Sequence, residues 1–323
     1  MSYEVHAHSE WRMPIGRRKK DERRFIDDIV NADQLSEVFF RVQLLAQALV
    51  TENKDYARMG ERPDRPAQGL RKMVEEKTLD RFFALQLSSY LDSGALNLLP
   101  TLPDLRLFPS NAWAIKTDFT LRKPYLSRDD TEFYILDNPV RKEWVFKVPY
   151  VAPSQWKGAL RAAMRQLRGY ITWEQESRDE QMIRLFGNVK GEEVEFSAGW
   201  LHFYPTYFTK IGLEVINPHS RETGAGERPI HFECVPAGSD DDPTRGSFTL
   251  LYVPLGEVRE EVCEQEMKAD FRAVAQGLKA MFTQYGFGAK TSSGLGRANV
   301  QWEEAEVQPN NLREEWEKIW KDG

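Results

Sequence analysis

The stretch from Tyr285 to Arg297 combines residue types that can bind a phosphate or a nucleic-acid backbone. It contains Gly286, Gly288, Lys290, Thr291, Ser292, Ser293, Gly294, Gly296 and Arg297, and no acidic residue. Glycines allow the backbone to adopt left-handed φ angles and to approach a ligand closely. Exposed N–H groups, hydroxyls and two cations are the donors that an anionic backbone needs. We refer to residues 285–297 as the glycine loop and expect it to bind a phosphate or a nucleic-acid backbone.

The glycine loop differs from the phosphate-binding loop of nucleotide enzymes. Ala289 precedes Lys290 where the Walker motif requires glycine. Residues 273–284 predict a helix before the loop and residues 298–307 a strand after it, whereas a nucleotide loop leads from strand to helix. A nucleotide-binding enzyme is therefore the least favoured interpretation. A turn that only connects the two elements is the structural alternative, although it needs fewer glycines.

A second cationic pattern lies on a helix predicted to begin at Pro153 and Ser154, with Ser154 as its N-cap. Its cations are Lys157, Arg161, Arg165 and Arg168. Their spacing of i, i+4, i+8 and i+11 puts them on one face of the helix. No acid occurs between residues 154 and 173, and like charges four residues apart repel each other. We therefore predict that this face binds an anion; a solvated face is the alternative.

Composition limits the classes of function. The chain has 323 residues, 41% of them hydrophobic, and a net charge of −6, which argues against non-specific binding of nucleic acid but allows a local basic groove. No apolar run approaches the roughly 20 residues of a membrane helix. Cys234 and Cys263 lack metal or redox spacing, so we expect ordinary thiols and a cytoplasmic protein. The five histidines form no zinc motif, and we expect neither a metal nor another cofactor.

The order of predicted elements indicates two parts. Residues 1–33 are polar and predict a solvated arm, or a tail that reaches an acidic partner. Residues 35–49 and 70–91 have helical periodicity and predict an antiparallel pair. We place a boundary near residue 112, so that residues 1–112 form an arm with a helical extension and residues 113–323 a second domain.

The second part has the order strand, basic helix, strands, long loop, strands, helix, glycine loop, strand. This order predicts an α+β, ferredoxin-like fold with large insertions. Sheets of this kind are a common platform for RNA. The long loop, residues 217–229, carries His219, for which no catalytic partner is identifiable by spacing.

Two of these stretches resemble motifs of the RAMP proteins, the repeat-associated subunits of CRISPR effector complexes. Residues 153–161, PSQWKGALR, are similar to the RAMP helix start, and residues 286–296 are similar to the RAMP C-terminal glycine-rich loop. The resemblance covers roughly residues 113–302, with Leu185-Phe-Gly187 as a lesser landmark. Residues 215–220 and 228–232 resemble the sixth subunit of the type III Cmr complex.

The resemblance implies a modified RNA-recognition-like fold that binds CRISPR RNA inside an RNA-targeting antiviral complex. The implied partners are CRISPR RNA, target RNA and other RAMP subunits, and the implied position is near the 3′ end of the guide. The implied RNA contacts are His219, the basic helix and the glycine loop. No membrane partner is expected.

Cleaving members of the family carry an aspartate in the loop after the first strand. Asp129 and Asp130 lie in the corresponding loop, but the glycines usual there are absent. We therefore expect a chain without catalytic activity of its own. The alternative is a metal-dependent endoribonuclease that cleaves target RNA with Asp129 or Asp130, and this alternative requires a divalent metal. A further departure is Gln155-Trp156, which puts a bulky indole at the helix start.

Overall fold

The computed structural model describes residues 12–16, 18–32, 38–61, 65–92, 99–129, 134–188, 197–217, 229–254 and 264–321. The chain forms two compact units. Unit 1 comprises Met1–Asn97, Leu126–Pro149 and Thr209–Pro236; unit 2 comprises Leu98–Tyr125, Tyr150–Phe208 and Ala237–Gly323. This grouping differs from a single division at residue 112, and the assignment of domains at that boundary stays a prediction.

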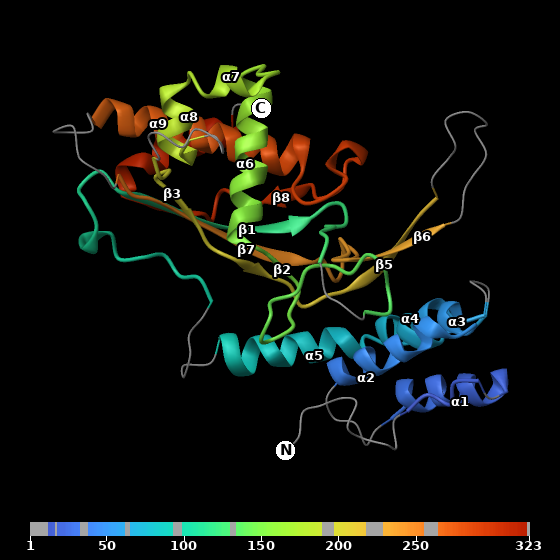
Figure 1. Cartoon of the computed structure of the whole chain (residues 1–323). Coiled ribbons are helices and arrows are strands. Elements are labelled where there is room, and N and C mark those ends of the chain that lie inside the picture. Colours follow the sequence, from blue (N-terminus) through green and yellow to red (C-terminus); the bar gives the residue numbers. More distant parts are fainter. Residues whose placement is uncertain are drawn as a thin grey trace. The chain divides into compact units, whose positions relative to one another are not determined.

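Unit 2 is built on an antiparallel sheet. Its strands are β1 (Trp113–Leu121), β3 (Leu201–Phe203), β7 (Arg245–Tyr252), β8 (Ala298–Val300) and β9 (Glu306–Gln308). The order across the sheet is β3-β7-β1-β8, and β9 also pairs with β1. The helices α6 (Pro153–Leu167) and α9 (Glu264–Ala280) lie on one side of this sheet (Figure 1). Along the chain the order is β1-α6-β3-β7-α9-β8, which confirms the predicted α+β, ferredoxin-like fold.

The central position of β1 follows from its alternating side chains. Trp113, Phe119 and Leu121 are buried, and Asp118 between them is exposed. β1 pairs with β7 in a register that places Trp113 opposite Tyr252, and their rings stack at 4.8 Å between centroids. Cross-strand aromatic pairs of this kind stabilise a sheet and fix its register.

The helices cover the sheet closely. α6 buries Trp156, Leu160, Ala163 and Met164. α9 approaches α6 at Gly277, where an added Cβ would lie 2.6 Å from the Met164 Cγ atom. Glycine at this position therefore permits the close helix–helix packing.

Shorter elements complete unit 2. They are η5 (Leu105–Leu107), β2 (Tyr150–Val151), α7 (Trp173–Glu176), α8 (Glu180–Phe186), β4 (Thr206–Tyr207), η6 (Met281–Tyr285), η7 (Thr291–Ser293), η8 (Asn310–Leu312) and α10 (Arg313–Lys321). The single strand predicted over residues 298–307 is wrong. β8 and β9 are separate strands joined by a turn, and they pair with opposite ends of β1.

Unit 1 combines helices with a two-stranded antiparallel sheet. Its elements are α1 (Lys19–Val30), α2 (Val38–Leu45), η3 (Ala46–Val50), α3 (Lys54–Met59), α4 (Gly69–Glu75), α5 (Thr78–Gln86), η4 (Leu87–Leu91), β5 (Gly212–Ile216) and β6 (Ile230–Cys234). No helix in the described part of the chain is long and apolar enough to cross a membrane.

Two sequence predictions for unit 1 are wrong. The polar arm contains α1, which buries Ile26, Ile29 and Val30, because these apolar residues recur at helical spacing among the charges. The helix predicted over residues 70–91 is broken at Lys77, which has a left-handed φ of 56°. A helix cannot continue through that conformation, so α4 ends and α5 begins there.

Trp156 and Trp144 offer a matched test of this packing. Trp156 is fully buried, whereas Trp144 is 80% exposed. Trp156→Ala should lower the free energy of unfolding by about 3–5 kcal/mol, because it removes a large core side chain and leaves a cavity. Trp144→Ala should change it by less than about 1 kcal/mol. Urea denaturation of both variants measures the difference, and equal effects would show that the indole of Trp156 is not a core anchor.

Candidate nucleic-acid interface

Three segments of unit 2 meet at the glycine loop. The turn after β1 is hydrogen-bonded to the end of the loop: the Arg122 N–H donates to the Arg297 carbonyl at 2.8 Å, and the Gly296 N–H donates to the Pro124 carbonyl at 2.9 Å. The start of α6 is the third segment, and its side chains contact the loop from inside. Residues 122–124, 153–157 and 285–297 together form what we call the loop surface.

Aromatic packing holds the loop surface together. The ring of Phe287 in the glycine loop lies 4.5 Å from the Trp156 ring and 5.6 Å from the Tyr125 ring, centroid to centroid. The Tyr125 hydroxyl donates to the Gln155 side chain at 2.7 Å. The Trp156 indole N–H donates to the Thr206 hydroxyl at 3.1 Å. Gln155 and Trp156 thus join the helix start to both loops, a role that the sequence did not reveal.

The helix begins differently from the prediction. The N-cap of α6 is Ala152, and Pro153 lies in the first turn, so the prediction of Ser154 as the cap is wrong. Proline is well suited to this position because its fixed φ matches the helix and it has no N–H to satisfy.

The glycines of the loop have two different roles. All four have positive φ, which confirms the expectation that at least one of Gly288 and Gly294 has this geometry. An added Cβ at Gly286 would lie 2.3 Å from the Leu295 carbonyl oxygen, and at Gly296 it would lie 1.9 Å from the Phe287 carbonyl oxygen. The absence of a side chain at these two positions therefore lets the two ends of the loop approach each other closely. A Cβ at Gly294 would meet nothing closer than 3.6 Å, so only its φ of 80° requires glycine.

The tip of the glycine loop presents donors to solvent. Lys290, Ser292 and Ser293 are exposed, and Lys290 itself has a left-handed φ of 55°. The Arg297 side chain lies beside Gly294, and its buried Nε has no hydrogen-bond acceptor among the described residues. A buried donor of this kind is costly unless a ligand satisfies it.

Arg122 and Lys123 are functional candidates that sequence reasoning missed. Both are exposed, and their side chains form no ion pair within the part of the chain that the structure describes. The sequence feature that could have identified them is the pair of adjacent cations directly after β1. Residues 119–127 and 285–302 contain no acidic residue, so the two paired segments add cations without compensating charge.

The predicted basic face of α6 is largely neutralised, which contradicts the premise that it lacks acidic partners. Arg161 and Arg165 both pair with Glu176 of α7, whose side chain is only 1% exposed; Arg165 is 3.2 Å from its carboxylate. Arg168 pairs with Asp179 at the start of α8. The segment that carries these acids, α7 and the start of α8, follows α6 in sequence and folds back beside it (Figure 1).

Lys157 differs from these arginines. It is half-buried and lies in the first half of α6. Burial, with a smaller contribution from the neighbouring charge of Arg161, lowers the pKa of its amino group. An anionic ligand would oppose both effects, so Lys157 suits an anion better than the arginines that already have partners.

Comparison with known proteins supplies the family. A model of the RAMP superfamily matches residues 110–299, more than half of the chain. The chain belongs to the RAMP superfamily. Over 177 residues it is 27% identical to a Streptococcus thermophilus protein named CRISPR system Cms endoribonuclease Csm3, a match that covers 50% of this chain and 73% of that protein.

Among solved structures, a chain in the cryo-EM structure of the Type III-B Cmr-beta bound to cognate target RNA is similar to this RAMP protein. The two chains are 17% identical, with a TM-score of 0.48, and the match covers 88% of this chain and 98% of that chain.

The remaining predicted site residues of this RAMP protein are Asp129, Asp130 and His219. Asp129 belongs to unit 1, where its N–H donates to the Pro139 carbonyl at 3.2 Å and its carboxylate is 3.5 Å from the Lys142 N–H. Asp130 and His219 lie outside the described residues. Within the described ranges, no three His, Cys, Asp or Glu residues are grouped as a metal site requires.

A buried ionic cluster lies beside Asp129. The Lys142 ammonium group is 2.5 Å from the carboxylate of Glu233, which is completely buried. The Tyr134 hydroxyl also donates to Glu233. Burial, together with the charge of Glu233, raises the pKa of Tyr134 well above its usual value. This cluster fixes residues 134–142 to β6 and is already satisfied internally, so we assign it a structural role.

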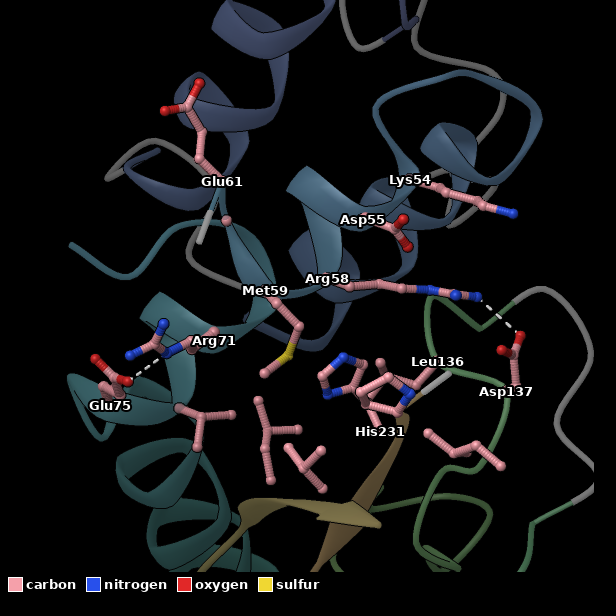
Figure 2. A pocket seen from close by; sticks show the side chains of 16 residues that line it. Lys54, Asp55, Arg58, Met59, Glu61, Arg71, Glu75, Leu136, Asp137 and His231 are labelled. Carbon is pink, nitrogen blue, oxygen red and sulfur yellow. Dashed lines mark hydrogen bonds and ion pairs between the residues drawn. The ribbon is translucent and has the colours of Figure 1, made fainter. Parts of the chain in front are cut away.

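Unit 1 contains a pocket of about 990 Å³ between α3, α4 and the β5–β6 hairpin. Figure 2 shows Met59, Leu136 and His231 at its centre, with ion pairs toward its rim. Arg58 pairs with Asp137 at 2.8 Å, and Arg71 pairs with Glu75 at 2.6 Å. The charged groups therefore compensate one another, and the pocket has no excess of cations for an RNA backbone.

Substitutions at Gly296 and Gly294 test the two roles of the loop glycines separately. Gly296→Ala should lower the free energy of unfolding by about 2–4 kcal/mol, because its Cβ would overlap the Phe287 carbonyl in a left-handed backbone. Gly294→Ala should cost only about 1 kcal/mol, from the backbone conformation alone. Chemical denaturation of both variants tests this order. The reverse order would contradict the close approach of the two backbone segments.

Proposed function

We propose that this RAMP protein is an RNA-binding subunit of a type III CRISPR effector complex and that its loop surface contacts the backbone of CRISPR RNA. One observation carries the proposal. Arg122, Lys123, Lys290 and Arg297 lie on two hydrogen-bonded segments that contain no acidic residue, in a protein whose net charge is −6. A local concentration of cations in an acidic protein is what selective binding of a polyanion requires.

The chemistry of the loop surface favours backbone contacts over base reading. Its donors are cations and the exposed Ser292 and Ser293 hydroxyls. Such groups recognise phosphate and sugar and do not distinguish bases. A subunit that must hold guides of any sequence needs this kind of contact.

The assignment to a type III complex is supported by the family and by the relative named as a Csm3 endoribonuclease. The proposed partners are CRISPR RNA, target RNA and other RAMP subunits. A position near the guide 3′ end is part of the proposal and rests on the resemblance to the sixth Cmr subunit.

Reversal of two exposed cations tests the RNA contact. Arg122→Glu with Lys123→Glu should weaken binding of single-stranded RNA by about tenfold or more, equally for unrelated sequences. The slope of log affinity against log salt should become shallower by about 1.4, since each lost phosphate contact on a single strand removes about 0.7. Fluorescence anisotropy over a salt series measures both.

The control for this experiment is Lys268→Glu with Lys318→Glu, which changes the net charge equally on exposed positions of α9 and α10. Unchanged affinity and slope in the Arg122 and Lys123 variant, or an equal loss in the control, would overturn the loop surface as the RNA contact. Reversal of Arg161 and Arg165 is a poor test, because it would place new carboxylates against buried Glu176.

Two substitutions in the glycine loop should differ in how strongly they reduce binding of guide RNA. Gly294→Val should lose guide RNA from the assembled complex, because a branched side chain is strained at a φ of 80° and blocks close approach. Lys290→Ala should weaken binding by about tenfold, as expected for one charge-assisted contact. Quantification of RNA in purified complexes distinguishes them. If Lys290→Ala loses the guide and Gly294→Val keeps it, the loop acts through charge alone.

The second candidate function is cleavage of target RNA, which the name of the Streptococcus thermophilus relative favours. Asp129 is the testable residue, because it is half-buried in the loop region after β1. We expect Asp129→Ala, alone and with Asp130→Ala, to leave every product of target cleavage by the complex unchanged. Loss of one product band on a denaturing gel would make this chain a nuclease subunit.

A further inference from the structure

The C-terminal end of α6 exposes an unusual set of apolar side chains. Leu167 is 48% exposed, Ile171 is 87% exposed and Trp173 is 55% exposed, although they lie within seven consecutive residues. Scattered single apolar residues are common on protein surfaces, but a group of them usually marks a contact with another molecule. We call residues 167–173 with their exposed side chains the α6 end patch.

The α6 end patch is held in a fixed conformation. The Gln175 side chain accepts hydrogen bonds from the N–H groups of Ile171 and Thr172 at 2.7 and 3.0 Å, and Thr172 and Gln175 form a capping box for α7. The Tyr170 hydroxyl donates to Asp179 at 2.7 Å. A surface that is ordered before binding loses little conformational entropy when a partner arrives.

The base of the patch is a neutralised cluster of arginines. The Arg165 guanidinium lies 3.8 Å from the centre of the Trp173 ring and also pairs with Glu176. Between residues 161 and 180 the chain has four arginines (161, 165, 168, 178) and four acids (174, 176, 179, 180), so the net charge of this stretch is 4 − 4 = 0. The arginines fix Trp173 and Glu176 and supply no excess charge.

These facts decide between a nucleic acid and a protein as the occupant. RNA would gain no net electrostatic attraction here, and it would have to displace ion pairs to a carboxylate that is almost completely buried. One face of the Trp173 ring is already covered by Arg165. Leu167 and Ile171 are aliphatic, and they suit an apolar protein surface better than a stack of bases.

We propose that the α6 end patch is the docking site for a neighbouring protein subunit whose contacting surface is apolar and close to neutral. The proposal rests on the proposed function in one respect, since the neighbour is another protein of the same effector complex. It gives the two ends of α6 different roles: the N-terminal end packs against the glycine loop through Trp156, and the C-terminal end contacts protein.

Site-specific photo-cross-linking distinguishes the two kinds of occupant. p-Benzoylphenylalanine is placed at Ile171, or at Val50 as a control of similar exposure (75%), in the full chain co-expressed with the proteins encoded beside it and with guide RNA. Irradiation should attach position 171 to one of the co-expressed proteins, and position 50 should not give that product. Attachment of position 171 to RNA, or no attachment within an assembled complex, would overturn the proposal.

A substitution gives the quantitative test. Ile171→Asp should reduce recovery of that neighbouring protein by at least about tenfold, as for a hot-spot residue, while binding of RNA by the isolated variant stays unchanged. Val50→Asp should recover the neighbour normally, and both variants should melt at the wild-type temperature because the positions are exposed. Normal recovery of the neighbour with Ile171→Asp would overturn the docking site.

Purification of the wild-type chain from the same co-expression tests the docking site and the RNA-binding function separately. If the chain is purified with guide RNA but with no other protein, the docking site is overturned and the RNA-binding function stands. If it is purified with neither, both are overturned.

Discussion

The packing of the Trp156 indole is the interaction on which the rest of unit 2 depends. The ring lies at the start of α6 and contacts Phe287 of the glycine loop, Phe119 of β1 and Phe248 of β7. A helix, two strands and a loop are therefore positioned by one side chain. Because the ring is fully buried, its own position is determined by close packing, and small displacements would be transmitted to the loop.

This arrangement explains how a glycine-rich loop can be ordered. Phe287 anchors the loop in the core, and the carbonyl groups of Pro124 and Gly296 accept main-chain hydrogen bonds at its base. Only the tip, with Lys290 and the following hydroxyl residues, is left to meet solvent. A loop of this kind combines the close backbone approach that glycine permits with the preorganisation that binding needs.

Electrostatic compensation divides the surface of the same helix into two regions. Glu176 and Asp179 neutralise the arginines of the C-terminal half of α6, whereas residues 119–127 and the glycine loop contain no acidic residue. Pairing with two guanidinium groups offsets part of the cost of burying the Glu176 carboxylate. Helix periodicity alone places all the cations of α6 on one face. Only the positions of their acidic partners show which of these cations are neutralised.

The sequence by itself determined the fold class and the family. The alternation of β1, the periodicity of α6 and α9 and the order of the elements follow from local side-chain patterns, and local patterns are readable without a structure. The positive φ angles of Gly288 and Gly294 were predictable for the same reason, because the absence of a Cβ is a property of the residue itself.

The tertiary structure alone decided which charges are compensated and which segments meet. The pairing of Arg161 with Glu176 depends on the chain folding back after residue 168, and the contact of Arg122 with Arg297 joins segments that are far apart in sequence. Charge compensation and burial are properties of neighbours in space, and spacing along the chain does not encode them.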